Sequence, residues 1–281
     1  MQNETASAAE AAANMMLNDP YDVSKKDREF YRAHGYVKLK GLLSKETVAW
    51  MNGCITEEVK RLNTQHLPMA ERDTYGKAFL QIMNIWTRSD IVKRIVFGRR
   101  LASVAAQLMG TQGVRLYHDQ ALYKEPGGGH TPWHADQYYW PLASDNTVTA
   151  WIPLQDTPLE MGPLEFSAGS DKLVQGRTLK ISDESESQID ELLGQSGLPH
   201  HVEAFDAGDV SFHKGWLYHR AGANRTDRMR SVMTMIYMDR DIRLKSPEND
   251  NQVNDWNTWC PGAKVGEVVA TPLNPVLFED R

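Results

Sequence analysis

The part of the chain that follows Gly113 most constrains how this protein can fold. Short runs of β-branched and aromatic residues alternate there with glycine, proline, asparagine and aspartate. Regularly spaced short strands with such turn residues are typical of a sandwich or barrel. The last run has apolar residues on both alternating faces, which predicts a strand that is covered on both sides. The runs are VRLYHDQALY, TVTAWIPL, GPLEFSAG, GDVSFH and RSVMTMIYM.

The first 110 residues have a different pattern and are predicted to be mainly helical. A short helix over KKDREFYRAHG is expected first, followed by a glycine stop and a strand over YVKLKGLL. Ser44 then caps a helix over residues 45–63, in which apolar residues recur at helical spacing. A second helical stretch is expected from about Asp90 to Met109, with Gly110 as its C-terminal glycine.

These patterns predict one domain, a helical part packed on an antiparallel double-sheet barrel. An acidic stretch, residues 183–199, is expected to be an excursion or lid rather than core. Residues 1–20 are expected to be a mobile N-terminal arm, with a helix from Ala6 to Met16 as the alternative. The C-terminal extension could cap the barrel, mediate a dimer or border the pocket. The predicted domain is 21–281, with a helical part over about 21–110, a barrel over about 111–240 and the extension over 241–281.

Composition and charge favour a soluble intracellular protein. The formal net charge of −6 does not suggest a surface that follows nucleic-acid phosphates. The two cysteines, Cys54 and Cys260, are too few for a disulfide framework or a thiolate metal cage, and they fit a reducing cytosol. The N-terminus does not resemble a signal peptide, and no apolar run approaches membrane-spanning length. We therefore expect a cytoplasmic protein without nucleic-acid or membrane partners; the oligomeric state is not predicted.

The segment GGGHTPWHADQYYWPL contains the residues best suited to metal chemistry. His134 and Asp136 are two residues apart, so on a strand both side chains project from the same face. One imidazole and one carboxylate supply two of the three ligands of the facial triad of non-haem Fe(II) sites. Such a pair alone is also typical of a surface histidine that is hydrogen-bonded to an aspartate, so the prediction depends on a third ligand.

The third ligand is expected in GDVSFHKGWLYHRAGANRTDRMRSVM. His219 lies near a predicted strand end, and Arg230 follows 11 residues later in the next strand. A guanidinium makes paired, charge-assisted bonds to a carboxylate, so Arg230 suits the distal carboxylate of 2-oxoglutarate. His213 is the alternative third ligand, but the spacing to Arg230 favours His219. His118 and Asp119 are adjacent and face opposite sides of a strand, so they cannot bind one metal together.

Several segments resemble the phytanoyl-CoA dioxygenase family. Members of that family are Fe(II)- and 2-oxoglutarate-dependent oxygenases with a double-stranded β-helix, also called a jelly roll or cupin-like barrel. The resemblance spans roughly residues 28 to 240 in the correct order. It implies that His134, Asp136 and His219 hold the iron and that Arg230 binds the cosubstrate. The segments are TPWHADQYYWPL, TVTAWIPLQDT, MGPLEFSAGSDK and GDVSFHKGWLYHRAGANRTDRMR.

The resemblance also implies further cosubstrate contacts. Gln120 and Trp151 fall where members of the family line the 2-oxoglutarate pocket, and Gln81 and Asn84 are candidates for other polar contacts. Two positions depart from the family pattern. Ala135 replaces a common glutamine between the two ligands and Ala221 replaces a frequent serine, so the immediate surroundings of the cosubstrate are expected to differ in detail.

Aromatic residues next to the proposed ligands predict a hydrophobic substrate pocket, although many of them also suit ordinary barrel packing. Tyr138 and Trp216 are expected to contact the substrate, because each is close in sequence to a metal ligand. The substrate is expected to be a small molecule.

The implied activity is hydroxylation of a small molecule, such as a secondary metabolite, at an unactivated C–H bond. O2 is the second cosubstrate, and succinate and CO2 are released. An acyl-CoA substrate is the alternative within the same family. A cupin-like metal enzyme that does not use 2-oxoglutarate is another alternative, but it would not need Arg230. A non-catalytic ligand-binding barrel would need neither the triad nor the arginine.

Overall fold

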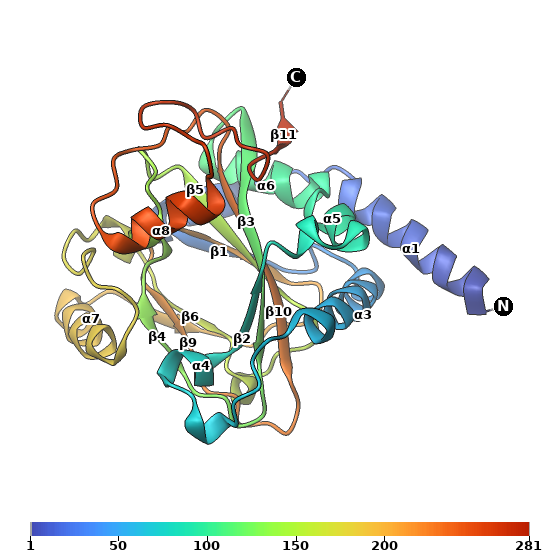
Figure 1. Cartoon of the computed structure of the whole chain (residues 1–281), viewed down its shortest axis with the longest axis horizontal. Helices are drawn as coiled ribbons and strands as arrows, with labels where there is room; N and C mark the ends of the chain where they lie inside the picture. Colours follow the sequence, from blue (N-terminus) through green and yellow to red (C-terminus); the bar gives the residue numbers. More distant parts are fainter. Residues whose placement is uncertain (1, 281) are drawn as a thin grey trace.

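The computed structural model describes residues 2–280, which form two antiparallel sheets with helices outside them (Figure 1). The strands are β1 (Tyr36–Leu39), β2 (Leu80–Met83), β3 (Gly113–Lys124), β4 (Thr131–His134), β5 (Thr147–Pro153), β6 (Leu164–Ser167), β7 (His200–Val202), β8 (Val210–Lys214), β9 (His219–Ala221), β10 (Arg230–Asp239) and β11 (Val276–Glu279). The larger sheet has the order β1-β8-β5-β10-β3-β11, with β2 paired to β3. The smaller sheet has the order β4-β9-β6-β7. The predicted antiparallel sheets and flanking helices are confirmed, but the fold is a mixture of helices and sheets rather than mainly β.

Helices predominate before β3, as predicted. The helices are α1 (Gln2–Asn18), α2 (Lys25–His34), α3 (Lys45–Leu62), α4 (Thr74–Ala78), α5 (Asp90–Val96), α6 (Arg99–Met109), α7 (Asp183–Ser196) and α8 (Asp250–Trp259). The predicted cap of α3 is present, because the Ser44 side chain accepts a hydrogen bond from the Thr47 amide. Across residues 2–280, no helix combines the length and the apolar character needed to span a membrane.

The predicted helical stretch from Asp90 to Met109 is interrupted, so its continuity was wrong. Gly98 is the N-cap residue that precedes α6, and α5 ends two residues before it. A Cβ atom at Gly98 would lie 3.1 Å from the backbone oxygen of Leu17, so the glycine allows the end of α1 to approach closely. The predicted end at Gly110 is confirmed: its φ of 71° lies in the left-handed region that favours glycine.

The larger sheet lies between the N-terminal helices and the smaller sheet (Figure 1). Strand β10 shows this arrangement most clearly, because all of its residues except the last are buried. Met233, Met235 and Tyr237 belong to the core shared with α3, α5 and α6. Val232 points the other way and packs with Phe166 of the smaller sheet. The prediction that this strand is covered on both sides is therefore confirmed.

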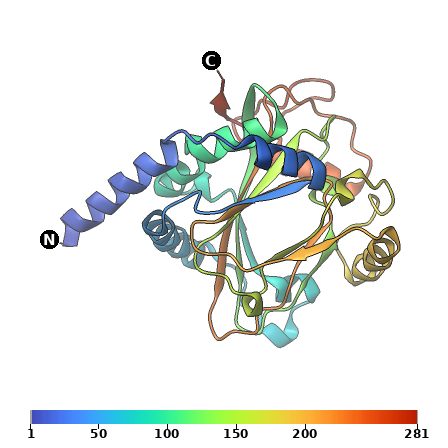
Figure 2. The same cartoon turned by 180° about the vertical axis from the view of Figure 1, so that it is seen from behind.

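Helix α1 lies at the edge of the molecule and extends away from it in Figure 2. Its C-terminal half is anchored, since Ala13 and Leu17 are each 1% exposed and the helix packs against α3 and α6. The helix that was the alternative for Ala6 to Met16 is thus present. Mobility of residues 1–20 stays a prediction.

The acidic stretch forms α7, which packs on the outside of β4 (Figure 1). Ile189 and Leu193 of α7 form a small core with Trp133 and Tyr218. The backbone N–H of Trp133 and its indole N–H donate to Glu186 and Asp190, respectively. Helix α7 therefore supports the back of a strand that ends at His134.

Candidate active site

The three predicted metal ligands lie close together beside the paired strands β4 and β9 of the smaller sheet. His134 ends β4, His219 begins β9, and the two residues are paired across these strands. Asp136 follows in a 3-10 turn, Asp136–Tyr139, rather than in the strand. The Nε2 atoms of His134 and His219 lie 3.6 and 3.7 Å from Oδ1 of Asp136. One ligand atom from each residue can be chosen so that all three lie within 4.8 Å of one another, which suits a single metal ion.

Backbone carbonyls orient both imidazoles. His134 Nδ1 is 2.7 Å from the Pro132 carbonyl oxygen, and His219 Nδ1 is 3.0 Å from that of Leu217. Because a carbonyl oxygen only accepts, each Nδ1 carries the hydrogen and each Nε2 presents its lone pair towards Asp136. Thr149 of β5 donates to Oδ2 of Asp136 over 3.0 Å and so fixes the carboxylate.

The ionisation states of these groups also suit a metal. Burial lowers the pKa of His134 and of His219 to about 4, so both imidazoles are neutral at pH 7. Burial on its own would raise the pKa of Asp136, but His219, His213 and His134 hold it well below its ordinary value. Two neutral imidazoles and an ionised carboxylate are the forms that bind a divalent cation.

His213, the alternative third ligand, lies on β8 and is 1% exposed. Its Nε2 atom is 3.4 Å from Oδ2 of Asp136, on the opposite carboxylate oxygen from His134 and His219. Among the described residues, the group that could hold a metal contains His219 and not His213. His213 instead packs beside His219, with ring centroids 4.4 Å apart.

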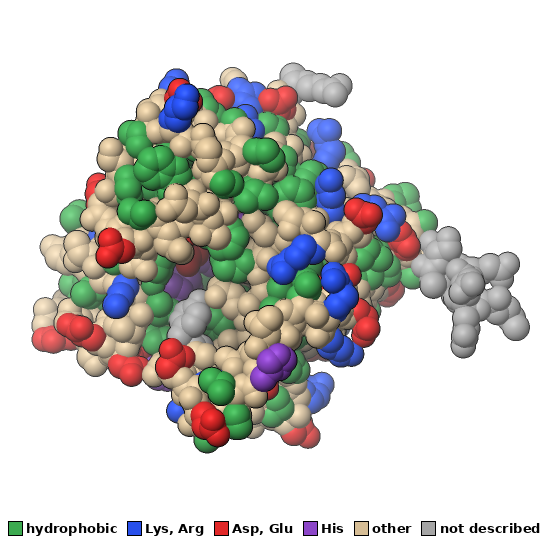
Figure 3. All heavy atoms as spheres, in the orientation of Figure 1, with side chains coloured by type: hydrophobic (Ala, Val, Ile, Leu, Met, Phe, Trp, Pro, Cys, Tyr) green, Lys and Arg blue, Asp and Glu red, His purple; other side chains and the backbone are tan. Residues whose placement is uncertain are grey.

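A cavity of about 510 Å³ contains the triad and most of the predicted cosubstrate residues. In the face drawn in Figure 3, histidine side chains are visible at the bottom of a hollow. Gln81 and Gln120 lie on the paired strands β2 and β3, and their side chains are 2.6 Å apart. Trp151 of β5 lines the same cavity, and the Arg230 guanidinium lies 5.7 Å from its ring centroid.

Arg230 is a buried cation without a carboxylate partner in the described part of the chain. One guanidinium nitrogen donates to the Gly162 carbonyl over 2.6 Å, while Nε is buried with no hydrogen-bond partner. Burial lowers the pKa of Arg230 to about 9, so the side chain stays charged at pH 7. An unpaired buried cation in this cavity fits a carboxylate ligand.

Three predicted residues lie elsewhere. Asn84 has a φ of 48°, and its side chain accepts from the Asp119 amide outside the cavity, so it shapes the turn after β2. The Tyr138 hydroxyl accepts a hydrogen bond from Asn251. Its neighbours Tyr139 and Trp140 line the cavity instead, because successive residues of a 3-10 turn point in different directions. The Trp216 indole donates to Asp145 outside the cavity. Asn84, Tyr138 and Trp216 are not among the described residues that line the cavity, so their contacts with cosubstrate and substrate stay predictions.

Residues near the C-terminus contribute a wall that sequence reasoning did not assign. Helix α8 lines the cavity with Asn251, Asn254, Asp255 and Trp259. Of the alternatives for the C-terminal extension, a border of the pocket is the one observed for α8. No local motif indicates this placement, because α8 is brought to the cavity by tertiary contacts alone.

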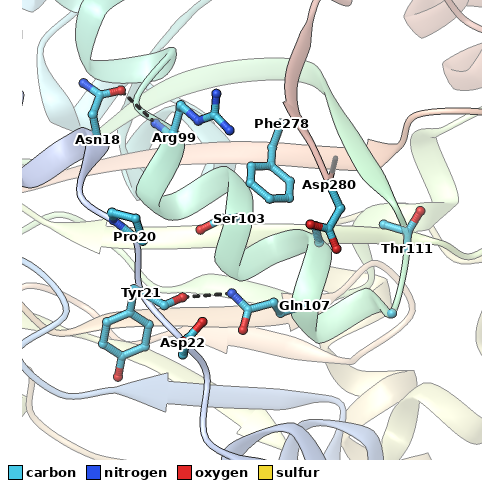
Figure 4. Close-up of a pocket in the computed structure, with 12 residues that line it drawn as sticks. Asn18, Pro20, Tyr21, Asp22, Arg99, Ser103, Gln107, Thr111, Phe278 and Asp280 are labelled. Atoms are coloured by element: carbon cyan, nitrogen blue, oxygen red, sulfur yellow. Dashed lines mark hydrogen bonds between the residues drawn. The ribbon is translucent and has the colours of Figure 1, made fainter.

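A second cavity of about 390 Å³ lies between the segment after α1, helix α6 and strand β11 (Figure 4). Hydrogen bonds from the Arg99 amide to Asn18 and from Gln107 to the Tyr21 carbonyl hold its sides together. Residues 97–100, FGRR, contain two adjacent arginines, and one of them, Arg99, lines this cavity rather than the cavity of the triad. The described group of possible metal ligands lies in the first cavity.

Comparisons with known proteins indicate the family and the fold of the chain. A probable alpha-ketoglutarate-dependent hypophosphite dioxygenase of Stutzerimonas stutzeri is 23% identical over 227 residues, which are 74% of this chain and 76% of that protein. Dioxygenase lolE1 of Epichloe uncinata is 25% identical over 226 residues, 76% of this chain and 82% of that protein. The solved structure of the epimerase SnoN in complex with Fe3+, alpha ketoglutarate and nogalamycin RO superimposes with a TM-score of 0.75 at 24% identity, covering 90% of this chain and 98% of SnoN. The likeness to SnoN shows the fold.

The match to a family model covers more than half of the chain. Two antiparallel sheets that bring two histidines and a carboxylate to one cavity define a mononuclear non-haem metal enzyme. The model of the phytanoyl-CoA dioxygenase family matches residues 31–232. The chain belongs to this family, and it is an iron- and 2-oxoglutarate-dependent oxygenase.

Proposed function

We propose that His134, Asp136 and His219 bind Fe(II) and that Arg230 binds the distal carboxylate of 2-oxoglutarate. One observation carries this proposal: the metal-binding group and an unpaired buried arginine line the same cavity. Gln120, Trp151 and Gln81 would form the remaining walls around the cosubstrate. We further propose that residues 21–281 are one domain whose two sheets form a double-stranded β-helix.

The side chains divide the work of the reaction between them. The carbonyls of Pro132 and Leu217 keep both imidazoles in the tautomer that presents Nε2, and Thr149 keeps the Asp136 carboxylate in place. Arg230 aligns the cosubstrate, while Trp151 and Ala221 exclude water from it. When bound, iron and 2-oxoglutarate supply the oxidation chemistry that uses O2. The protein then selects which C–H bond of the substrate lies within reach.

The substrate is proposed to be a small molecule that is hydroxylated with release of succinate and CO2. The cavity has room for a cosubstrate and a compact substrate at once. Besides the buried Arg230, Lys180 is the one lysine or arginine among the described residues that line it. An acyl-CoA would need several cations near the mouth for its phosphates, so the lining favours a small metabolite.

The proposal is tested by anaerobic addition of Fe(II) and 2-oxoglutarate to the full-length protein. The wild type should develop the weak visible charge-transfer band of the chelate. His219→Ala should lose the band, because one ligand is missing. Arg230→Ala should require much more 2-oxoglutarate, by roughly 100-fold, because a buried charge-assisted pair is lost.

Exposed residues of the same types provide matched controls. His66→Ala and Arg228→Ala should leave the band and its 2-oxoglutarate dependence unchanged, since both side chains are exposed and line neither the triad nor the cavity. A wild-type protein that binds iron but shows no band with 2-oxoglutarate would overturn the assignment.

A further inference from the structure

One part of the active-site cavity is not used by the metal or the cosubstrate. Helix α8 lies outside the residues matched by the family model, 31–232, and forms one wall of this part. Strand β3 contributes His118 to the same cavity. The substrate must occupy the space that the cosubstrate leaves, so the chemistry of this wall bears on what the substrate is.

A bulge in β3 turns two neighbouring residues towards α8. His118 pairs with Ile236 of β10, but the next pair is Leu116 with Tyr237, so Tyr117 is the extra residue. The His118 ring lies 5.0 Å from the Trp259 ring, and the Tyr117 hydroxyl lies 3.1 Å from Oδ2 of Asp255. Without the bulge, adjacent residues of a strand would face opposite sides of the sheet.

Asp255 is a buried carboxyl group with no cationic partner in the described part of the chain. It is 8% exposed and lines the cavity. Burial raises its pKa to about 7, although hydrogen bonds from the Tyr117 and Trp259 side chains act in the opposite direction. These hydrogen bonds offset only part of the cost of burying a carboxylate, and a nearby positive charge would offset more of it.

His118 is a second, independent indication that a ligand binds at this wall of the cavity. Its side chain is 4% exposed, lines the same cavity, and has a buried Nδ1 atom without a hydrogen-bond partner. Burial lowers the pKa of His118 to about 4, so the ring is neutral at pH 7 and has one acceptor nitrogen. A carboxylate and a neutral imidazole together suit a ligand group that is rich in N–H donors.

The charges of the other groups leave Asp255 uncompensated. The charges of Fe(II) and doubly ionised 2-oxoglutarate cancel, and so do those of Asp136 and Arg230. Among the described residues of the lining, the other charged ones are Asp73 and Lys180, which are exposed and of opposite sign, and Asp255. Asp255 is therefore a buried acidic group without a compensating charge, and it is ionised above about pH 7.

We propose that this wall recognises a protonated amine of the substrate, with Asp255 as its ionic partner and His118 as a second acceptor. The inference rests on the proposed function, because it names the substrate class of that same site. A purely architectural role for Asp255, as the tie between α8 and Tyr117, would need only a hydrogen-bond acceptor and not a charge.

Two probes of equal size test the proposal: cyclohexylmethylamine, which is protonated near neutral pH, and cyclohexylmethanol, which is neutral. Their binding to the full-length protein is measured by titration calorimetry at about pH 8, where both the amine and Asp255 are ionised. The wild type should bind the amine at least about 10-fold more tightly than the alcohol. Equal affinities, or no amine binding at millimolar concentration, would overturn the proposal.

Three variants separate charge from architecture. Asp255→Asn keeps an acceptor for the Tyr117 hydroxyl and should lose the preference for the amine. Tyr117→Phe removes the hydrogen bond to Asp255 but keeps the carboxyl group, and should retain the preference when it is titrated at about pH 9, because loss of that bond raises the pKa of Asp255. Asp73→Asn, at the exposed acidic residue of the same cavity, should also retain it. If Asp255→Asn binds the amine as the wild type does, the carboxylate is not the ionic partner and the proposal fails.

The titrations are made on the metal-free protein and again with Fe(II) and 2-oxoglutarate under anaerobic conditions. An amine preference without the chelate band would contradict the proposed function and not the recognition of the amine. The band without an amine preference would contradict this inference and leave the proposed function intact.

Discussion

Asp136 is the residue on which most contacts of the metal site converge. Its Oδ1 atom faces both candidate histidine ligands, while its Oδ2 atom accepts from Thr149 and lies 3.4 Å from His213. Thr149 is therefore expected to hold the carboxylate in the orientation that binds a metal. Groups that orient metal ligands commonly change metal affinity by about 10-fold to 100-fold when they are removed.

Thr149→Val should therefore weaken binding of Fe(II), or of Co(II) as an oxygen-stable substitute, by about 10-fold or more. The variant keeps the shape of the side chain and removes only the hydroxyl donor. Calorimetric titration of the metal-free protein measures the effect. Thr234→Val is the matched control, because the Thr234 hydroxyl donates to the Gln120 carbonyl and not to Asp136. Equal metal affinity in Thr149→Val and wild type would contradict the positioning role.

Site residues that lie close together in the sequence could be predicted from it. Site residues that only the tertiary structure brings together could not. His134 and Asp136 are two residues apart, and His219 and Arg230 bracket a recognisable run, so the sequence indicated all four. Tyr138 was predicted from its closeness in sequence to a metal ligand, but such closeness does not report the direction of a side chain in a 3-10 turn, and Tyr139 lines the cavity instead. His118 faces the substrate space beside Trp259, and nothing in the local sequence signals the bulge at Tyr117.

At the scale of elements, two loops contact each other closely beside Arg230, which is proposed to bind the cosubstrate. Gly162, just before β6, has a φ of 70°, and a Cβ atom there would lie 2.2 Å from the Gly222 carbonyl oxygen. Gly222 directly follows β9, whose first residue is His219. The Gly162 carbonyl also accepts from Arg230. This one glycine therefore positions the loop that orients Arg230 against the strand that carries a metal ligand.

Gly162→Ala should lower stability by more than the cost of left-handed backbone alone, which is about 1–2 kcal/mol for a non-glycine residue. It should also raise the 2-oxoglutarate concentration needed for the chelate band, because the carbonyl that orients Arg230 must move. Gly197→Ala provides the comparison: its φ is 67°, but a Cβ atom there would meet no atom within 4 Å. Chemical denaturation and the anaerobic band measure the two effects. The same 2-oxoglutarate dependence in both variants would contradict the proposed role of Gly162.

At the scale of the whole molecule, alternating hydrophobic runs predicted the sheets, and helix caps predicted the N-terminal helices. The bulge in β3, the break between α5 and α6 and the placement of α8 depend on contacts between distant segments. Leu17 approaches Gly98, and Asp255 approaches Tyr117, across separations that no local pattern reports. The chain thus combines a core whose pattern matches its family with a C-terminal wall that adds a buried carboxyl group to the cavity.

The central claim is that one cavity holds Fe(II) at the triad and 2-oxoglutarate at Arg230. Anaerobic crystals that contain both can be measured at the iron absorption edge, where anomalous scattering locates the metal. The predicted result is a single strong peak in contact with Nε2 of His134, Nε2 of His219 and the Asp136 carboxylate, with a carboxylate of 2-oxoglutarate on Arg230. A peak at another position, or 2-oxoglutarate bound away from Arg230, would contradict the account.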